Sequence, residues 1–310
     1  MSIYISGSMA YDRIMDFPDS FSDCILPDKI HILNVCFLIN RLEEKLGGCA
    51  GNIAYSLNLL GEKSTIVASA GQDFAKYEAV LAEWGLTAEG ITRYDDEFTA
   101  GAYIITDSNN NQITAFNPGA MRHPATYTFK NMTANDIQVV APTNLADMVN
   151  HPRICREKGA RCIFDPGQQI PALTGAQLLE AINGSYMLIC NDYEFEMICK
   201  ATGKTLEELL EMTEYVITTL GEEGSRVQTE DSVRLVPAVK ARKNTDPTGA
   251  GDAYRAGLLK GMSLGLSVVE SARIGSTVAS FCVEDYGTQT HTFTLDECRD
   301  RHEKAFGSRF

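Results

Sequence analysis

The chain has 310 residues, 44% of them hydrophobic and 22% charged, a composition typical of a globular protein with a substantial core. Its formal net charge of −14 at pH 7 predicts repulsion from nucleic acids and from acidic membrane surfaces. No apolar run is long enough to span a membrane, and we expect no signal peptide, because the first residues lack a basic region before an apolar one. The nine cysteines are scattered without a CxxC pair, which indicates neither a disulfide framework nor a zinc site and favours a reducing cytoplasm.

The first predicted element is a short buried strand at residues 3–8, which ends in small residues and leads to Asp12. A second strand-like run occupies residues 31–39. Because no neighbouring run matches it, we expect this second strand to lie outside the central sheet.

A pair of glycines, Gly47 and Gly48, precedes a predicted helix whose apolar residues recur at helical spacing between residues 50 and 60. The pair is equally consistent with a simple turn and with a stretch of backbone that approaches a substrate. In the second case Asn52, in the first turn of the helix, would present its amide to substrate hydroxyl groups.

Two β-rich segments lie outside the alternation of strands and helices that fills the rest of the chain. Residues 98–106 and 112–116 are typical of a hairpin around the turn-forming tract 107–111. We expect the segments at about 11–46 and 95–118 to pair as a small flap, or lid, over one edge of the main sheet.

Short apolar runs alternate with helical segments through the remainder of the chain. Short strands without internal alternation, interleaved with helices, indicate a mainly parallel sheet covered on both faces, an α/β/α arrangement. With no repeat and no linker, residues 1–310 are expected to form a single domain that carries the lid. The predicted strands are 65–70, 137–141, 162–164, 186–190, 215–220 and 226–228, and the clearest helices are 175–182 and 206–212.

Polar residues follow several of these strands directly: Asp165, Asn191 with Glu194, and Thr219 with Gly221. In open α/β sheets ligands bind beyond the carboxyl ends of the strands. We therefore expect these groups to meet at one edge of the sheet and to form a site there.

The stretch Gly249-Ala250-Gly251-Asp252 stands where an apolar helical run begins. The first N–H groups of a helix lack intrahelical partners and its dipole favours negative charge, so small residues at this place predict an anion cradle. Asp252 in the first turn is consistent with mere stabilisation of the helix start, or with a base that takes a proton from an attacking hydroxyl. The run of small residues favours the base.

Two further motifs permit alternative interpretations. Asn191 and Glu194 are spaced as oxygen ligands of Mg²⁺, and equally as an N-cap residue with its capping-box partner, and the two roles are compatible. The loop between Gly221 and Gly224 can run along a nucleotide or form only a tight turn. The Walker-like residues 203–205 lack the first glycine of that motif, and Thr205 with the following helix is instead typical of a capping box.

Four motifs, taken together, resemble those of the PfkB family of carbohydrate and nucleoside kinases, which have the ribokinase fold. DPTGAGDAYRAGLLKG (residues 246–261) is similar to the family's C-terminal signature and LGGCAGNIAYSLNLLG (46–61) to its N-terminal one. NDYE (191–194) resembles its NxxE motif and TTLGEEGS (218–225) its nucleotide-binding loop. Within the family, the chain looks most like bacterial adenosine kinases.

The resemblance implies a role for each motif. Asp252 would accept the proton of the sugar 5′-hydroxyl, and the amides of Gly249, Ala250 and Gly251 would hold the migrating γ-phosphoryl group of ATP. The other implied contacts are Asp12, Gly48 and Asn52 on the ribose; Phe116, with Phe98, on the purine; Ser8, Gln168 and Gln169 elsewhere on the substrate; Asn191, Thr219, Gly221, Gly224 and Gly251 on ATP; and Asn191 with Glu194 on Mg²⁺ and its waters.

Pro247 departs from the DTTGAGD sequence of many relatives, but the cradle amides lie beyond it. Some family members bind a monovalent cation such as K⁺ near the residues that match Asp246 and Thr248, which leaves this possibility open here. The expected function is therefore an ATP- and Mg²⁺-dependent conversion of adenosine to AMP by a cytoplasmic monomer or homodimer. A ribokinase-like sugar kinase, a broader purine nucleoside kinase and a non-catalytic nucleoside-binding regulator are the alternatives.

Overall fold

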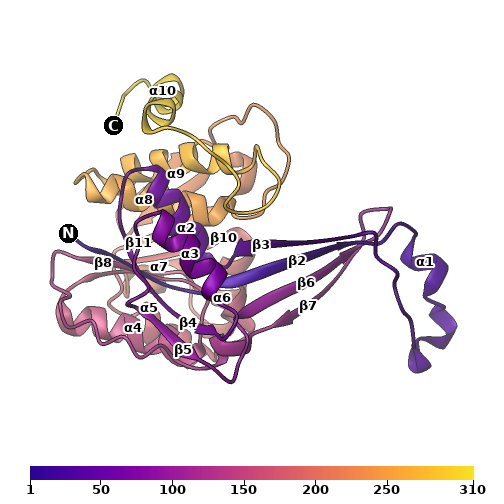
Figure 1. Ribbon diagram of the computed structural model, residues 1–310. Helices are drawn as coiled ribbons and strands as arrows, with labels where there is room; N and C mark the ends of the chain where they lie inside the picture. Colours follow the sequence, from indigo (N-terminus) through magenta and orange to yellow (C-terminus); the bar gives the residue numbers. More distant parts are fainter.

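A nine-stranded sheet lies at the centre of the computed structural model, which describes residues 1–310 (Figure 1). The strand order is β13-β12-β11-β10-β9-β8-β1-β4-β5. Neighbouring strands from β11 to β5 are parallel, whereas β12 and β13 run antiparallel at one edge. The strands are β1 (Ile3–Ser6), β4 (Thr65–Gly71), β5 (Ile91–Tyr94), β8 (Ile137–Val140), β9 (Arg161–Phe164), β10 (Met187–Asn191), β11 (Tyr215–Thr219), β12 (Ser225–Thr229) and β13 (Ser232–Val236).

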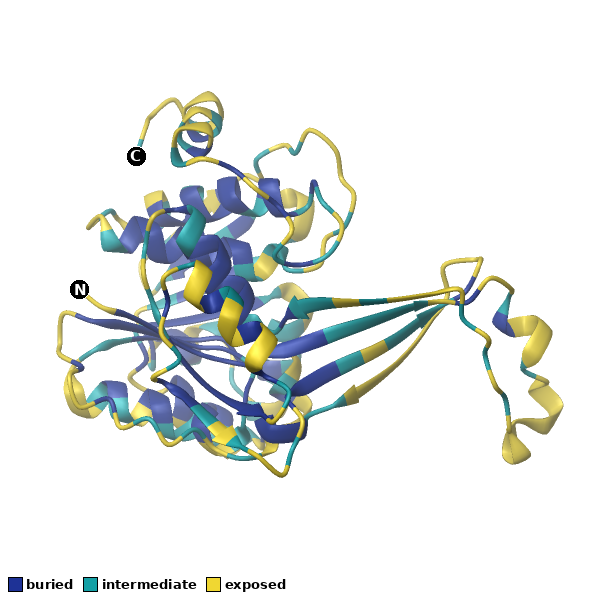
Figure 2. Ribbon diagram, in the orientation of Figure 1, coloured by how far each residue is buried: buried dark blue, intermediate teal, exposed yellow.

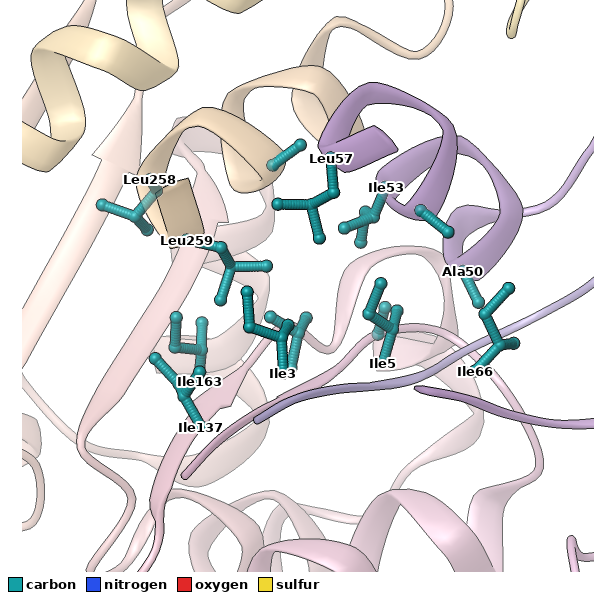
Figure 3. Close-up of a cluster of buried hydrophobic side chains, with 14 of the residues drawn as sticks. Ile3, Ile5, Ala50, Ile53, Leu57, Ile66, Ile137, Ile163, Leu258 and Leu259 are labelled. Carbon is teal, nitrogen blue, oxygen red and sulfur yellow. The ribbon is translucent and has the colours of Figure 1, made fainter. Parts of the chain in front are cut away.

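Helices cover both faces of this sheet, as the apolar strands predict. Consecutive residues of β1 enter different cores: Ile3 and Ile5 pack on one face and Tyr4 on the other. Figure 3 shows the first core, where strand isoleucines face Ile53 of α2 and Leu259 of α8. The helices on that face are α2 (Cys49–Leu59), α3 (Ala75–Glu83), α8 (Ala250–Ser263) and α9 (Val268–Cys282), with α10 (Leu295–Phe306) packed on α9; those on the other are α4 (Leu145–Lys158), α5 (Gly175–Ile182), α6 (Asp192–Thr202) and α7 (Leu206–Leu210).

The predicted central strands are confirmed to within two residues at each end, and the helix at 175–182 is confirmed as α5. Side-chain caps fix several helix starts. At α7 the Thr205 side chain accepts from the Glu208 N–H, and the Glu208 side chain accepts from the Thr205 N–H, so the predicted capping box is present. No helix combines the length and the apolar composition that a membrane span requires.

A second, four-stranded sheet extends from the body of the molecule (Figure 1). Its order is β3-β2-β6-β7, so the two β-rich segments of the sequence do pair with each other, through β2 and β6. The strands are β2 (Ala10–Asp16), β3 (Arg41–Gly47), β6 (Ala100–Thr106) and β7 (Gln112–Asn117).

The strand predicted at residues 31–39 is wrong. A 3₁₀ helix, η1 (Pro27–Ile32), occupies its start, the rest is irregular, and the strand of this region is β3. Residues 31–39 pair with no strand, because they lie on an arm beyond the second sheet (Figure 2), where Ile32, Leu33 and Leu38 are exposed. Phe17, Phe21 and Phe37 pack on one another, with centroids 4.9–5.8 Å apart, at the base of this arm, which also carries α1 (Phe21–Cys24).

Helices α8 and α9 approach closely because glycines face each other across the contact. A Cβ on Gly257 would lie 2.7 Å from the Gly275 Cα and 2.7 Å from the Ile274 carbonyl oxygen. These are backbone atoms that cannot move aside without separating the helices. The contact holds α8, which carries Asp252, against the body of the protein.

We predict that Gly257→Ala destabilises the protein by about 1–3 kcal/mol, because overpacking at a helix contact outweighs the better helix propensity of alanine, which is worth about 1 kcal/mol. Urea denaturation of the variant and of the wild type measures the difference. A more stable variant would show that the two helices are free to separate.

Candidate active site

Polar groups were predicted to meet at the carboxyl ends of the parallel strands, and three of these strands carry them. Asn191, at the end of β10, pairs in register with Thr219, at the end of β11. Asp165, directly after β9, is buried and forms an ion pair with Arg255 of α8. This ion pair connects the sheet to the helix that carries Asp252.

The start of α8 offers free backbone donors, as an anion cradle requires. Gly249 caps the helix in the left-handed region, with φ of 80°, where glycine is favoured. The Ala250 N–H donates to the Pro247 carbonyl at 3.1 Å. The N–H groups of Gly249, Gly251 and Asp252 donate to no protein acceptor, and they are the amides that remain for an anion.

Asp252 meets Asn52 across the gap between α8 and α2. The Asn52 Nδ2 donates to the Asp252 Oδ2 at 2.8 Å. Burial raises the pKa of Asp252 to about 6, although Arg255 and the Asn52 bond lower it and the charge of Asp165 raises it further. A carboxyl with a pKa near neutrality is well matched to proton transfer at physiological pH.

Arg255 is a buried cation that faces three acidic groups near the cradle. Its Nε lies against the Asp165 Oδ2. Burial alone would lower the pKa of Arg255, but Asp165, followed by Asp252 and Glu194, raises it. Burial raises the pKa of Asp165 and of Glu194, and Arg255 lowers both.

Arg255 was not among the site residues predicted from the sequence. A signal was present, because Arg255 is the charged residue inside the apolar run that follows Asp252, and a buried charge needs a partner. Its partner Asp165 was expected at the site only as a polar group after a strand.

Asn191 and Glu194 form the capping box that was one of their two interpretations. The Glu194 N–H donates to the Asn191 Oδ1 at 2.7 Å, and the Asn191 N–H donates to the Glu194 Oε2 at 2.8 Å. The Glu194 Oε1 takes no part in it. The chain gathers no cluster of three or more His, Cys, Asp or Glu side chains suited to a metal. These oxygens therefore fit a Mg²⁺ held mainly by water and by a triphosphate, and not one held by protein ligands alone.

The glycine pair before α2 brings the backbone of three elements together. Gly48 has φ of 87°, and a Cβ there would lie 2.5 Å from the Ser8 carbonyl oxygen. The Ser8 Oγ accepts from the Cys49 N–H at 3.0 Å. Asp12 lies against Gly47, whose Cβ would be 2.5 Å from the Asp12 Oδ2. Ser8 and Asp12 thus lie against the glycine pair at the base of the second sheet, and the Asn52 N–H donates to the Gly48 carbonyl at 2.9 Å.

Asp12 and Phe116 lie on the same face of the second sheet. Asp12 pairs with Ala102 across β2 and β6, and Ala102 pairs with Phe116 across β6 and β7. Paired residues of neighbouring strands point to the same side. Phe116 is 52% exposed and Phe98, just before β6, is 54% exposed, so both rings are accessible to a ligand.

The glycines of the predicted nucleotide loop enclose the 3₁₀ turn η4 (Gly221–Glu223). Gly221 has φ of 56° and Gly224 φ of 99°, and a Cβ on Gly224 would collide with the Val236 carbonyl oxygen. The Asn244 Nδ2 donates to the Glu222 Oε1 at 3.1 Å. That bond joins the loop to the segment leading into the cradle.

Among the remaining predicted residues, Gln169 and Asp246 form hydrogen bonds with backbone groups outside the contacts described so far. The Gln169 Nε2 donates to the Thr143 carbonyl at 3.1 Å, while Gln168 is exposed, and no hydrogen bond joins either residue to Asp252 or Asn52. Asp246 accepts from the Thr248 N–H at 2.9 Å and from the Gly287 N–H at 2.8 Å. Burial would raise the pKa of Asp246, but these bonds lower it.

Comparison with known proteins gives a consistent family. Residues 19–294 match the sequence profile described as pfkB family carbohydrate kinase. The chain is 33% identical to a nucleoside kinase of Methanocaldococcus jannaschii, over 87% of this chain and 90% of that protein. It is also 33% identical to a nucleoside kinase of Methanothermobacter thermautotrophicus, over 88% and 90%.

A solved structure of Burkholderia thailandensis nucleoside kinase in complex with inosine superposes on the chain with a TM-score of 0.84. The two sequences are 36% identical, and the match covers 99% of both chains. Ribokinase from Thermotoga maritima, 20% identical with a TM-score of 0.77 over 97% of this chain and 99% of that one, supports the ribokinase fold alone.

We predict that Arg255→Met lowers the free energy of unfolding by about 3–5 kcal/mol, because it leaves Asp165 buried without its counter-ion. The double variant Asp165→Leu with Arg255→Met removes both charges and should recover most of that loss. Urea denaturation of the wild type, the single variant and the double variant measures the coupling. Equal stability of the single and double variants would mean that Asp165 is not ionised in the folded protein.

Proposed function

The chain belongs to the pfkB family of carbohydrate kinases, and from that premise we propose that it transfers the γ-phosphoryl group of ATP to the 5′-hydroxyl of adenosine. Membership makes it a phosphotransferase with an alcohol acceptor. The observation that carries the proposal is the position of Asp252, in the first turn of α8 beside free amides and within hydrogen-bond distance of Asn52.

Asp252 accepts the proton of the acceptor hydroxyl as its oxygen attacks the γ-phosphorus, and the bond to the leaving ADP breaks on the opposite side. The free amides of Gly249 and Gly251 donate to the transferring phosphoryl oxygens, where a preorganised donor is worth about 3–4 kcal/mol. Phosphoryl transfer needs mainly in-line placement and charge stabilisation, which these groups provide. Mg²⁺, when bound beside Asn191 and Glu194, supplies positive charge to the triphosphate.

A nucleoside is the acceptor that best accounts for the second sheet. Asp12 lies near the base of the sheet, where a ribose would meet it, and Phe116 lies two strands further along the same face. A free sugar has no π face for such a ring, whereas a purine does. We propose that the second sheet is a lid that closes over the base within a single domain and excludes water.

A broader purine nucleoside kinase is the second candidate. It is favoured by the inosine bound to the Burkholderia thailandensis enzyme, which is 36% identical to this chain. A regulator that binds nucleosides without catalysis would have no use for a carboxylate beside free amides.

We also propose a cytoplasmic enzyme, consistent with nine free cysteines, acting as a monomer or homodimer. A K⁺ ion near Asp246 and Thr248 stays a prediction.

In a coupled ADP assay with adenosine, inosine, guanosine, ribose and fructose 6-phosphate, we expect kcat/KM to be highest for adenosine. Phe116→Ala should lower the value for adenosine about 5- to 150-fold, as expected when base stacking worth about 1–3 kcal/mol is lost. The value for ribose should not change.

Ile113→Ala is the matched control, because Ile113 lies on the same strand but on the opposite face, and it should leave both values unchanged. A preference of the wild type for a bare sugar would overturn the nucleoside assignment while retaining the family and the role of Asp252.

We predict that Asp252→Asn loses nearly all turnover while its affinity for adenosine changes little, as measured by calorimetry. The variant should also be more stable than the wild type above pH 6. The folded pKa of Asp252, about 6, lies above its unfolded value of 3.8, so the wild type loses stability as pH rises through 6, and asparagine does not. The expected gain is about 1–2 kcal/mol in urea denaturation at about pH 8, vanishing near pH 4. Wild-type kcat in the variant would eliminate Asp252 as the base.

A further inference from the structure

A chain of hydrogen bonds connects Asp252 to the backbone carbonyl of Gly47, at the end of β3 just before α2. From Asp252 it runs through Asn52, whose Oδ1 accepts from the Gln289 Nε2 at 2.8 Å. The same Gln289 Nε2 donates to the Tyr77 hydroxyl at 2.7 Å, and that hydroxyl donates to the Gly47 carbonyl at 2.9 Å. The chain therefore joins α8, α2, the loop after α9, α3 and β3.

The direction of every bond in this chain follows from its last member. A backbone carbonyl can only accept, so the Tyr77 hydroxyl must give its single proton to Gly47 and must accept from Gln289. Gln289 must then present its NH₂ group, whose second proton goes to Asn52. Asn52 must in turn present its carbonyl oxygen to Gln289, which leaves its NH₂ for Asp252.

We propose that Tyr77 and Gln289 are positioning residues of the kinase reaction, which orient the Asn52 amide so that it always donates to the carboxylate of Asp252. The inference rests on the proposed function and extends it to two residues that touch neither the phosphoryl group nor the acceptor. With the amide of Asn52 reversed, two oxygens would face each other and Asp252 would have to hold a proton, which removes the base.

The surroundings hold the relay in one arrangement. Tyr77 is fully buried, and a Cβ on Gly51 would collide with its hydroxyl, so glycine is required there. Burial raises the pKa of Tyr77, which keeps it a proton donor. Gln289 has φ of 56°, in the left-handed region, and its neighbour Thr288 donates through Oγ1 to the Leu46 carbonyl at 3.0 Å.

Other groups also act on Asp252, and the relay adds to their effects. From α8 comes the guanidinium of Arg255, and from the end of β9 the carboxylate of Asp165. Cys49 of α2, Cys282 of α9 and Tyr77 of α3 are neutral neighbours whose pKa values burial raises. The bond from Asn52 lowers the pKa of Asp252, in agreement with a donor held toward it.

The test is the pH dependence of kcat with adenosine in Gln289→Glu and Tyr77→Phe. The ionised carboxylate that the first variant introduces can only accept, so it draws the NH₂ of Asn52 away from Asp252. The acidic limb of the profile should then move up by about one pH unit, the loss expected for a hydrogen bond to a charged group. Tyr77→Phe removes the enforced direction and should move the limb the same way by a smaller amount.

Tyr55→Phe is the matched control. Tyr55 is also buried, and its hydroxyl donates to the His291 carbonyl at 2.6 Å in the same C-terminal loop, outside the relay. It should leave the acidic limb in place. A limb unchanged in both relay variants, or shifted equally in the control, would overturn the proposal.

A second readout does not depend on the substrate. The carboxyl carbon of Asp252, followed by ¹³C NMR in the free protein, should titrate at higher pH in Gln289→Glu than in the wild type. If the wild type phosphorylates none of the five acceptors but the carbon titration shifts, the proposed function fails and the relay stands. If the wild type is active and the titration does not shift, the relay fails and the function stands.

Discussion

The site depends above all on the buried ion pair between Asp165 and Arg255. Asp165 follows a central strand of the sheet, and Arg255 lies one turn beyond Asp252 on α8, so the pair fixes the start of this helix against the ends of the strands. Removing two charges from water is costly, and only close pairing offsets that cost. A guanidinium suits this place because it stays charged when buried, whereas an ammonium group readily loses its proton.

The pair neutralises itself, so Glu194 and Asp252 leave the site with an excess of negative charge. Asp165, Glu194 and Asp252 face a single guanidinium, in a protein whose net charge is already −14. A triphosphate would be repelled here unless amides and a divalent cation oppose that charge. The free N–H groups at the start of α8 bind phosphate oxygens without adding charge. The Glu194 carboxylate oxygen outside the capping box attracts the cation.

Local patterns predicted the central strands and the start of α8, because buried parallel strands are apolar throughout and a glycine-rich helix start is visible in a few residues. They did not predict β3, because its sequence Arg41–Gly47 is mostly polar. They predicted a strand at the more apolar residues 31–39 instead. A strand is defined by its partner, and the partner β2 lies elsewhere in the chain. For the same reason no local pattern could identify Gln289, which meets Asn52 across 237 positions of sequence.

Burial and hydrogen bonding have opposite effects on the pKa of Asp252. Burial makes the carboxylate a stronger base and also makes the folded protein less stable at neutral pH, since the charged form is poorly solvated. The Asn52 donor stabilises the charged form and so limits both effects. A donor free to reverse would let Asp252 take up a proton and would favour the inactive, more stable state. The Gly47 carbonyl, through Tyr77 and Gln289, keeps the Asn52 amide donating to Asp252. It therefore opposes the protonated state of Asp252, which is the more stable state but cannot act as the base.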